Sequence, residues 1–319
     1  MKNLRPRIAY AKVVVAAVAV VVVAPASAGA ATVVNGDFEA GNLSGWQSSN
    51  VGPGAWVAYT DSSAQLPEAP PVPVPPVPQG NFAAITLQQF VSRQILYQDV
   101  PLEPFYKHQL TLTAYYKSNA PIETANTLSP EGEGEGSPNQ QYRIDVMSPA
   151  APLDSVNPSD ILAPVFATRT GGPKEMGPTQ FSVDLTPFAG QTVRLRMAVV
   201  VNTAGLNGGV DSVSITSTPP SNVITLGKPK RNKKKGTAKE PVTVPGPGTL
   251  TLAGKGVVNQ TKTSTAAGTV NLLVKSKGKQ KKKLNKAGKV KVKVTVTYTP
   301  TGGLPNSQSR KLILKKRLH

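Results

Sequence analysis

The sequence has no cysteine, so disulfides cannot stabilise its fold. It has only two histidines, His108 and the last residue His319, and no spacing typical of a His or Cys metal site or of a nucleophile with its base. A glycine-rich phosphate loop is also absent from the sequence. These absences predict a protein that is not an enzyme. A carboxylate pair for glycoside cleavage stays open, because residues 32–218 carry 16 acids, but no pattern brings two of them into one cleft.

Long apolar runs are missing after the N-terminal region. Residues 1–12 carry four basic residues, and the Val and Ala run that follows at 13–23 is too short to span a bilayer. The Ala-Ser-Ala sequence at 26–28, just after this run, fits the rule for signal-peptide cleavage after Ala28, with Ala30 as the alternative. We therefore expect residues 1–28 to be a signal peptide and the protein to be secreted, extracellular or associated with the cell wall. An uncleaved membrane anchor is the other interpretation.

Acidic residues are almost missing from the last third of the chain. Residues 32–218 contain 8 Lys and Arg against 16 Asp and Glu, a net charge of −8. Residues 219–319 contain 24 Lys and Arg against the single Glu240, a net charge of +23. This asymmetry predicts two domains, at 32–217 and 223–319, with a linker at 218–222. It also predicts that the second domain attracts polyanions.

Helix signals are scarce, whereas short runs of alternating polarity between turn residues are frequent. Such runs predict an all-β protein, here a jelly-roll β-sandwich followed by a smaller β-sandwich. In the run 192–201, Arg194 and Arg196 are expected on the solvent face. In the run 290–298, valines alternate with lysines, so the valines are expected inside and the lysines outside.

Two inserts interrupt the first predicted domain. Residues 67–80 are half proline and predict a stiff, extended spacer loop, with a ligand for a proline-reading domain as the alternative. Residues 129–140 are acidic and rich in glycine. They predict a solvated loop, with a calcium-catching loop as the alternative.

Three sequences resemble the family 4/9 carbohydrate-binding modules: NGDFEAGNLSGW at 35–46, DLTPFAGQTVRLRMAVV at 184–200 and GGVDSVSI at 208–215. The resemblance covers about residues 32–217, with well-matched ends and a weakly matched middle. It implies a galactose-binding-like jelly roll and a polysaccharide or glycan as the partner.

The same resemblance implies one structural calcium ion. Its ligands would be the carbonyl of Asp37 and the carboxylates of Glu39 and Asp211, which are the hard oxygen ligands that calcium prefers. A bound ion would join distant segments of a domain that has no disulfide. The other interpretation is that the two carboxylates only accept backbone hydrogen bonds in turns.

The second domain resembles basic modules that are appended to secreted actinobacterial proteins. The resemblance rests on GPGTLTLAGKGV at 246–257, KKLNKAGKVKVKVTVTYTPTGG at 282–303 and SRKLILKK at 309–316. The length of the domain fits an immunoglobulin-like β-sandwich. The resemblance implies a fold and a bacterial surface setting, and no activity.

Aromatic residues make up only 5% of the chain, although sugars bind by stacking on aromatic rings. Alternation places Tyr115 opposite Leu112 and Ala114, so we predict that Tyr115, with Trp56 and Tyr59, binds a sugar. The remaining aromatic candidates are Trp46, Tyr97, Tyr106 and Tyr142. The other interpretation is that these rings are core, and for Trp46 this is the better one.

Two lysine-rich stretches predict contacts with an anionic cell-wall polymer. The candidate residues are Lys228, Lys230, Arg231, Lys233, Lys234, Lys235, Lys281, Lys282 and Lys283. Aromatic residues are absent between these lysines, so we expect no specific nucleic-acid binding. The alternative is a solubilising surface.

Together these patterns predict a secreted, non-catalytic protein that binds carbohydrate or adheres to a cell surface. One alternative is an accessory part of, or a degenerate, polysaccharide hydrolase or lyase. Another is a purely structural cell-wall protein.

Overall fold

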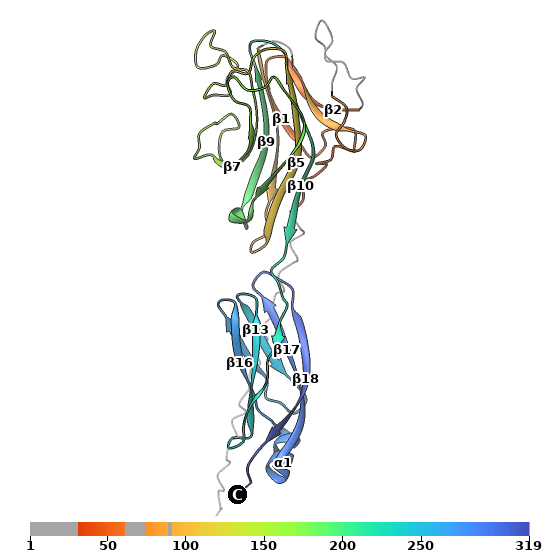
Figure 1. Ribbon diagram of the computed structural model, residues 1–319, viewed down its shortest axis with the longest axis vertical. Helices are drawn as coiled ribbons and strands as arrows, with labels where there is room; N and C mark the ends of the chain where they lie inside the picture. Colours follow the sequence, from red (N-terminus) through yellow and green to blue (C-terminus); the bar gives the residue numbers. More distant parts are fainter. Residues whose placement is uncertain (1–30, 61–74, 89–90, 319) are drawn as a thin grey trace, which may run out of the picture.

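The computed structural model describes residues 31–60, 75–88 and 91–318. The predicted signal peptide and most of the proline-rich insert lie outside these residues. The described chain forms two β-sandwiches stacked end to end (Figure 1). The all-β fold class predicted from the sequence is confirmed. Among the described residues, no helix is long and apolar enough to cross a membrane.

The first sandwich has two five-stranded antiparallel sheets. Sheet I has the order β1-β4-β9-β6-β7, formed by β1 (Gln47–Val51), β4 (Ser92–Pro101), β9 (Thr192–Val201), β6 (Gln141–Met147) and β7 (Ile161–Ala167). Sheet II has the order β2-β3-β10-β5-β8, formed by β2 (Gly54–Tyr59), β3 (Ala83–Gln88), β10 (Leu206–Thr218), β5 (Lys107–Ser118) and β8 (Glu175–Asp184). A 3₁₀ turn, η1 (Thr186–Phe188), connects β8 to β9.

Three apolar clusters stabilise the first sandwich. The main cluster lies between the sheets and takes alternate residues of β9, among them Leu195, Met197 and Val199. The second cluster contains Tyr115 of β5, and the third contains Ala198 of β9. Both are strand residues whose neighbours in the sequence belong to the main core. Because neighbouring residues of a strand point to opposite faces, these two clusters lie on the outer faces of the sheets. Loop segments therefore cover part of both outer faces.

The acidic turn at the start of the first sandwich holds a buried tryptophan. Trp46 stacks on Phe38, with 5.6 Å between the ring centroids, and its indole N–H donates to the carbonyl of Asn35 at 3.0 Å. The ring is 8% exposed. The interpretation of Trp46 as core is confirmed.

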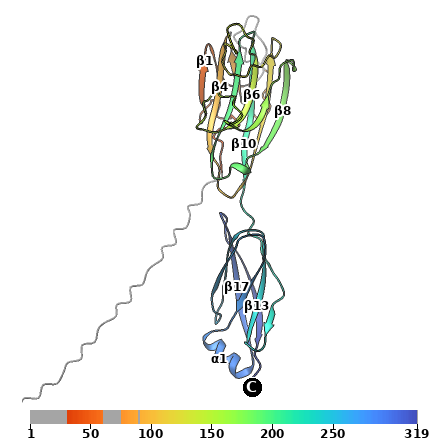
Figure 2. The ribbon, with the colours of Figure 1, turned by 90° about the vertical axis from the view of Figure 1, so that its left-hand side faces the viewer.

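The second sandwich has two four-stranded sheets. Sheet III pairs β13 (Thr237–Val244) with β11 (Thr225–Leu226), β12 (Lys230–Asn232) and β16 (Gly268–Val274). Sheet IV has the order β15-β14-β17-β18, formed by β15 (Gln260–Ser264), β14 (Gly248–Ala253), β17 (Lys289–Pro300) and β18 (Asn306–Lys315). The helix α1 (Gly278–Ala287) lies at the end farthest from the first sandwich (Figure 2).

The core of the second sandwich follows the alternation of β17. Val290, Val292, Val294 and Val296 are buried, whereas the lysines between them are exposed, as the sequence predicted. The single acid, Glu240, is also buried and pairs with Arg310 at 3.1 Å — its only cationic partner among the described residues. The exposed surface of this sandwich therefore carries no described carboxylate side chain.

Candidate functional site

The three aromatic residues predicted to bind sugar are buried. Trp56, Tyr59 and Tyr115 are 4%, 5% and 1% exposed. Trp56 faces the main core, and its indole N–H donates to the carbonyl of Gln94 at 3.2 Å. The hydroxyls of Tyr59 and Tyr115 hydrogen-bond to each other at 2.7 Å. These rings do not form the exposed stacking surface that the sequence analysis expected.

Trp56 is buried because it points into the main core, whereas Tyr59 and Tyr115 are buried because a loop covers the outer face of sheet II. Tyr115 does point away from the main core, but Val77 packs against its cluster and the Tyr59 hydroxyl donates to the carbonyl of Pro75 at 3.0 Å. The Tyr115 ring also lies over Gly209, where a Cβ would come within 2.1 Å of a ring carbon. Burial raises the pKa of both hydroxyls, that of Tyr59 to about 12.

The predicted calcium ligands lie where the opening turn meets β10. Asp211 is fully buried, and its two carboxylate oxygens accept the backbone N–H groups of Gln79 at 3.0 Å and of Ser212 at 2.6 Å. Glu39 accepts the backbone N–H groups of residues 81 and 82 at 2.8 and 3.0 Å. Both carboxylates therefore accept backbone hydrogen bonds, as the alternative interpretation expected.

Electrostatics distinguishes the two carboxylates. Burial, with a smaller contribution from the nearby charge of Glu39, raises the pKa of Asp211 to about 6, against the effect of the backbone hydrogen bonds. The pKa of Glu39 is lowered, first by the N–H of Phe82 and then by that of Asn81. Neither carboxylate has an ion pair with a Lys, Arg or His of the described chain. Asp37 is exposed, and its carboxylate accepts the N–H of Glu39 at 3.4 Å.

The backbone around these acids is strained. Asn35, Phe38 and Ser212 have φ values of 49°, 56° and 53°, a left-handed conformation that residues with a Cβ seldom adopt. The pairing of β10 with β5 also shifts register after Asp211, and Val213 in that bulge donates to the carbonyl of residue 36 at 2.8 Å. The bulge and the opening turn therefore hold each other in place.

The donor set fits a divalent cation only in part. No three His, Cys, Asp or Glu side chains of the described residues are arranged to hold a metal. A cation beside Glu39 and Asp211 would therefore need backbone carbonyls or water for its remaining ligands, which calcium accepts. Asp211 is buried without a described cationic partner and is acted on by the charge of Glu39, which matches the chemistry of such an ion.

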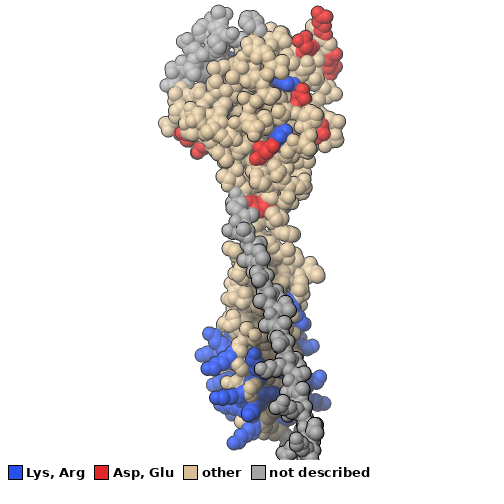
Figure 3. Space-filling view, turned by 180° about the vertical axis from the view of Figure 1, so that it is seen from behind, with Lys and Arg blue, Asp and Glu red and all other residues tan. Residues whose placement is uncertain are grey.

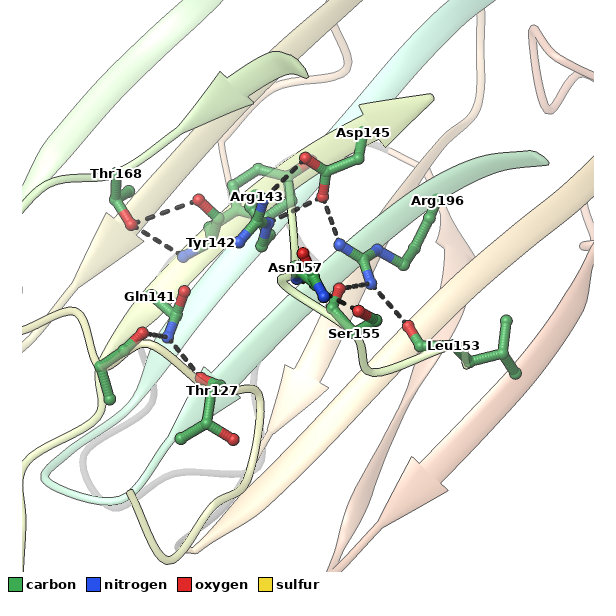
Figure 4. Close-up of polar contacts among 11 residues, drawn as sticks. Thr127, Gln141, Tyr142, Arg143, Asp145, Leu153, Ser155, Asn157, Thr168 and Arg196 are labelled. Atoms are coloured by element: carbon green, nitrogen blue, oxygen red, sulfur yellow. Dashed lines mark hydrogen bonds and ion pairs between the residues drawn. The ribbon is translucent and has the colours of Figure 1, made fainter. Parts of the chain in front are cut away.

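A buried ion-pair cluster lies on the outer face of sheet I (Figure 4). Arg196 donates to Asp145 at 2.5 Å, and Arg143 donates to the same carboxylate at 2.7 and 2.9 Å. The other end of the Arg196 guanidinium donates to the carbonyls of Leu153 and Ser155, both at 2.7 Å. Arg196 is 0% exposed, so its expected position at the solvent is wrong. The loop between β6 and β7 covers it.

A half-exposed polar patch continues on the same face, and we call it the Tyr97 patch. The Tyr97 hydroxyl donates to Gln47 at 2.8 Å, and the Arg194 guanidinium lies 4.8 Å from the ring centroid. Arg194 also donates twice to Asp99, at 2.6 and 2.8 Å. The patch combines an aromatic edge with amide, carboxylate and guanidinium groups, the chemistry that recognises sugar hydroxyls. In the sequence, Tyr97 was one of several aromatic candidates, and the pairing of β1, β4 and β9 brings the patch together.

The predicted polyanion contacts gather at the far end of the second sandwich (Figure 3). The backbone of Arg317 donates to the carbonyl of Lys233 at 2.9 Å, and Lys316 donates to Asn285 of α1 at 2.8 Å. Three basic runs, at 233–235, 279–286 and 315–317, therefore meet at one end. We call this surface the basic end. The first two runs were predicted from the sequence as polyanion contacts, and the third was not.

His108 is held inside the first sandwich. Its ring is 1% exposed and bonds to Ser217 at 3.0 Å and to the carbonyl of Glu103 at 2.8 Å. These contacts join β5, β10 and the turn before β5. They stabilise the end of the first sandwich that is nearer the second sandwich.

No protein-family model and no curated protein matches the chain. Among solved structures, it is similar to an adhesin domain of Lys-gingipain from Porphyromonas gingivalis, with 14% identity and a TM-score of 0.34 over 59% of this chain and 98% of that one. It is also similar to a xylanase of Clostridium thermocellum with CBM22-1 and GH10 modules, solved with xylohexaose, with 13% identity and a TM-score of 0.31 over 62% of this chain and 30% of that one. A tailspike protein of bacteriophage CBA120 matches with 13% identity and a TM-score of 0.34, and 21% of its length is covered. At these scores the likenesses do not assign a family or a ligand.

Proposed function

We propose that this is a secreted, non-catalytic adhesion protein whose basic end holds it to an anionic polymer of the cell surface. The observation that carries the proposal is the collection of three basic runs at one end of the molecule, on a sandwich whose single acid is buried. Lysines on a surface without carboxylates attract polyanions by releasing counterions.

The experiment that tests this proposal is co-sedimentation of the full chain with purified bacterial cell walls between about 50 and 200 mM salt. Retention should fall steeply as salt rises. Lys233, Lys234 and Lys235 changed together to Gln should reduce the salt slope by about 3, since each lost phosphate contact removes about one unit. The matched control changes Lys107, Lys117 and Lys174 of the first sandwich to Gln and should leave the slope unchanged. Retention that does not depend on salt would refute electrostatic anchoring.

For the first sandwich we propose glycan binding at the Tyr97 patch. The support is a half-exposed aromatic edge beside planar hydrogen-bonding groups on the outer face of sheet I. Retention of the full chain on insoluble polysaccharides, measured at about 0.5 M salt to screen the basic end, should fall for Tyr97→Ala. Phe105→Ala removes a ring that is 61% exposed outside the patch and is the control. Equal retention of wild type and Tyr97→Ala on every polysaccharide that binds would refute this site.

We also propose that calcium stabilises the start of the first sandwich. Glu39, Asp211 and the carbonyl of Asp37 would hold it, with further carbonyls or water. The ion would balance two neighbouring negative charges and join the opening turn to β10. The buried carboxylate of Asp211, which has no ion pair with a cation of the described chain, supports this proposal.

A further inference from the structure

Lysines lie directly opposite each other on the outer face of sheet IV. In the register of β17 and β18, Lys293 faces Lys311 and Lys289 faces Lys315, and all four are exposed. Lys291 lies between the two pairs on the same face. We call these five residues the lysine ladder. Like charges that face each other across two strands repel and destabilise the sheet.

The same two strands carry neutral pairs nearer the first sandwich. There the hydroxyls of Thr295 and Ser309 bond at 2.8 Å, and those of Thr297 and Ser307 bond at 2.6 Å. Strand pairing alone therefore does not require lysine at these positions. The outer face changes from hydrogen-bonded hydroxyls to repelling ammonium groups as it approaches the basic end.

Nothing in the described part of the second sandwich neutralises the ladder. Glu240 is the single acid of residues 219–319, and it is buried against Arg310. A further exposed pair, Lys230 opposite Lys239, lies on sheet III. Because the core lies between sheets III and IV, the opposed pairs occupy both outer faces of the sandwich.

We propose that the lysine ladder is the binding site of a linear phosphodiester polymer without bases, such as a poly(polyol phosphate). This inference rests on the proposed anchoring function and names its ligand and its site. Facing Cβ atoms are about 5 Å apart, so one phosphate can accept hydrogen bonds from both lysines of a pair. Positions on one face of a strand repeat about every 7 Å, so the two pairs lie about 14 Å apart with the single Lys291 between them, and an extended chain can place a phosphate at each of the three positions. Bound phosphates remove the repulsion between the strands.

Two other anionic partners fit the site less well. Single-stranded nucleic acid gains affinity by stacking its bases on aromatic rings, and the single aromatic residue of 223–319, Tyr298, is 0% exposed. A flat membrane can lie against the ladder on sheet IV, but it cannot at the same time reach the pair of Lys230 and Lys239 on sheet III. A flexible polymer can contact the ladder and then continue around the basic end.

The test compares two full-chain variants with the same change in charge. The ladder variant changes Lys289, Lys293, Lys311 and Lys315 to Gln, and the helix variant changes Lys279, Lys281, Lys282 and Lys283 of α1 to Gln. Binding of poly(glycerol phosphate) is measured by calorimetric titration. We expect the ladder variant to bind about tenfold or more weakly than the helix variant, because it loses paired contacts and the helix variant loses single ones.

Thermal unfolding of the second sandwich gives an independent readout. Without polymer at low salt, the ladder variant should melt higher than wild type, because the repelling pairs are gone. Polymer should raise the melting temperature of wild type and of the helix variant, and raise that of the ladder variant much less.

The failure of this inference can be separated from the failure of the proposed function. Equal weakening of both variants, with salt-dependent wall retention intact, would overturn the ladder as the site and leave anchoring in place. Tighter binding of a single-stranded oligonucleotide, or of vesicles with anionic lipid, than of poly(glycerol phosphate) would overturn the ligand class. Loss of salt-dependent wall retention in wild type itself would refute the proposed function.

Discussion

The carboxyl group of Asp211 gives the sharpest prediction for the first sandwich. Its folded-state pKa is about 6, against 3.8 ordinarily, so folding disfavours its ionised form. Stability from this group is therefore fully present below pH 3.8 and is lost as pH rises through 6. A shift of about two units corresponds to about 3 kcal/mol of unfolding free energy in the absence of metal.

The substitution Asp211→Asn should remove this part of the pH dependence. Asn has one acceptor oxygen where Asp211 accepts from both Gln79 and Ser212, so one N–H loses its partner at a cost of about 1–3 kcal/mol. The two effects oppose each other above pH 6. The informative quantity is therefore the difference between the wild-type and variant curves as a function of pH, measured by urea denaturation from about pH 4 to 8 with a chelator present.

Calcium should act on the wild type in the same pH window. The ion binds the ionised carboxylate, so it competes with the proton, and its effect should be absent near pH 4 and full above pH 6. At free calcium about one hundred times its Kd, the gain is about 2.7 kcal/mol. Asp211→Asn should lose this gain. Asp154→Asn, whose exposed carboxylate pairs with Arg93 at 2.7 Å, is the control and should keep it.

Two results would refute this reasoning separately. If wild type and Asp211→Asn had parallel pH profiles with chelator, the buried carboxyl would not titrate as its surroundings require. If calcium stabilised both proteins equally at pH 7.5, the ion would bind elsewhere or not at all.

Two further predictions concern buried polar groups of the same sandwich. Arg196→Met should destabilise it by about 3 kcal/mol and increase hydrogen exchange at residues 153–155, because the change breaks a buried ion pair and frees two carbonyls; unchanged exchange would contradict that role. Tyr115→Phe should lower the unfolding free energy by about 1 kcal/mol through loss of its bond to Tyr59 and leave polysaccharide retention unchanged. Lost retention at full stability would instead return Tyr115 to the ligand site.

Local alternation predicted which face of each strand a residue occupies. The valines of β17 are inside and its lysines outside, and Tyr115 and Arg196 both point away from the main core, as the pattern indicated. Alternation did not predict whether the outer face meets water. That depends on loops distant in sequence, here the segment around Val77 and the β6–β7 loop at Leu153. The wrong expectations for Tyr115 and Arg196 share this physical origin, whereas Trp56 is buried because it faces the main core.

The helix α1 shows a second limit. Its residues form a lysine run, and the N-cap residue Lys277 makes no side-chain hydrogen bond to the start of the helix. The run becomes helical because Lys, Gln, Leu and Ala favour helices, because Leu284 is buried, and because Gly288 ends the helix with a φ of 62°. The burial of Leu284 depends on contact with the rest of the sandwich, and the sequence of the lysine run alone does not predict that contact.

The lysine ladder shows why some sites are visible only in the fold. The sequence places lysine at alternate positions of β17 and at positions 311 and 315 of β18, and each strand alone looks like an ordinary solvated edge. Only the register makes Lys289 face Lys315 and Lys293 face Lys311, and a shift of one residue would separate them onto opposite faces. A solubilising coat needs charge but not register, because isolated lysines keep a protein in solution equally well. Opposed lysine pairs add repulsion between the strands and do not make the protein more soluble than isolated lysines would. An anion held between the two lysines of a pair explains why the pairs are there.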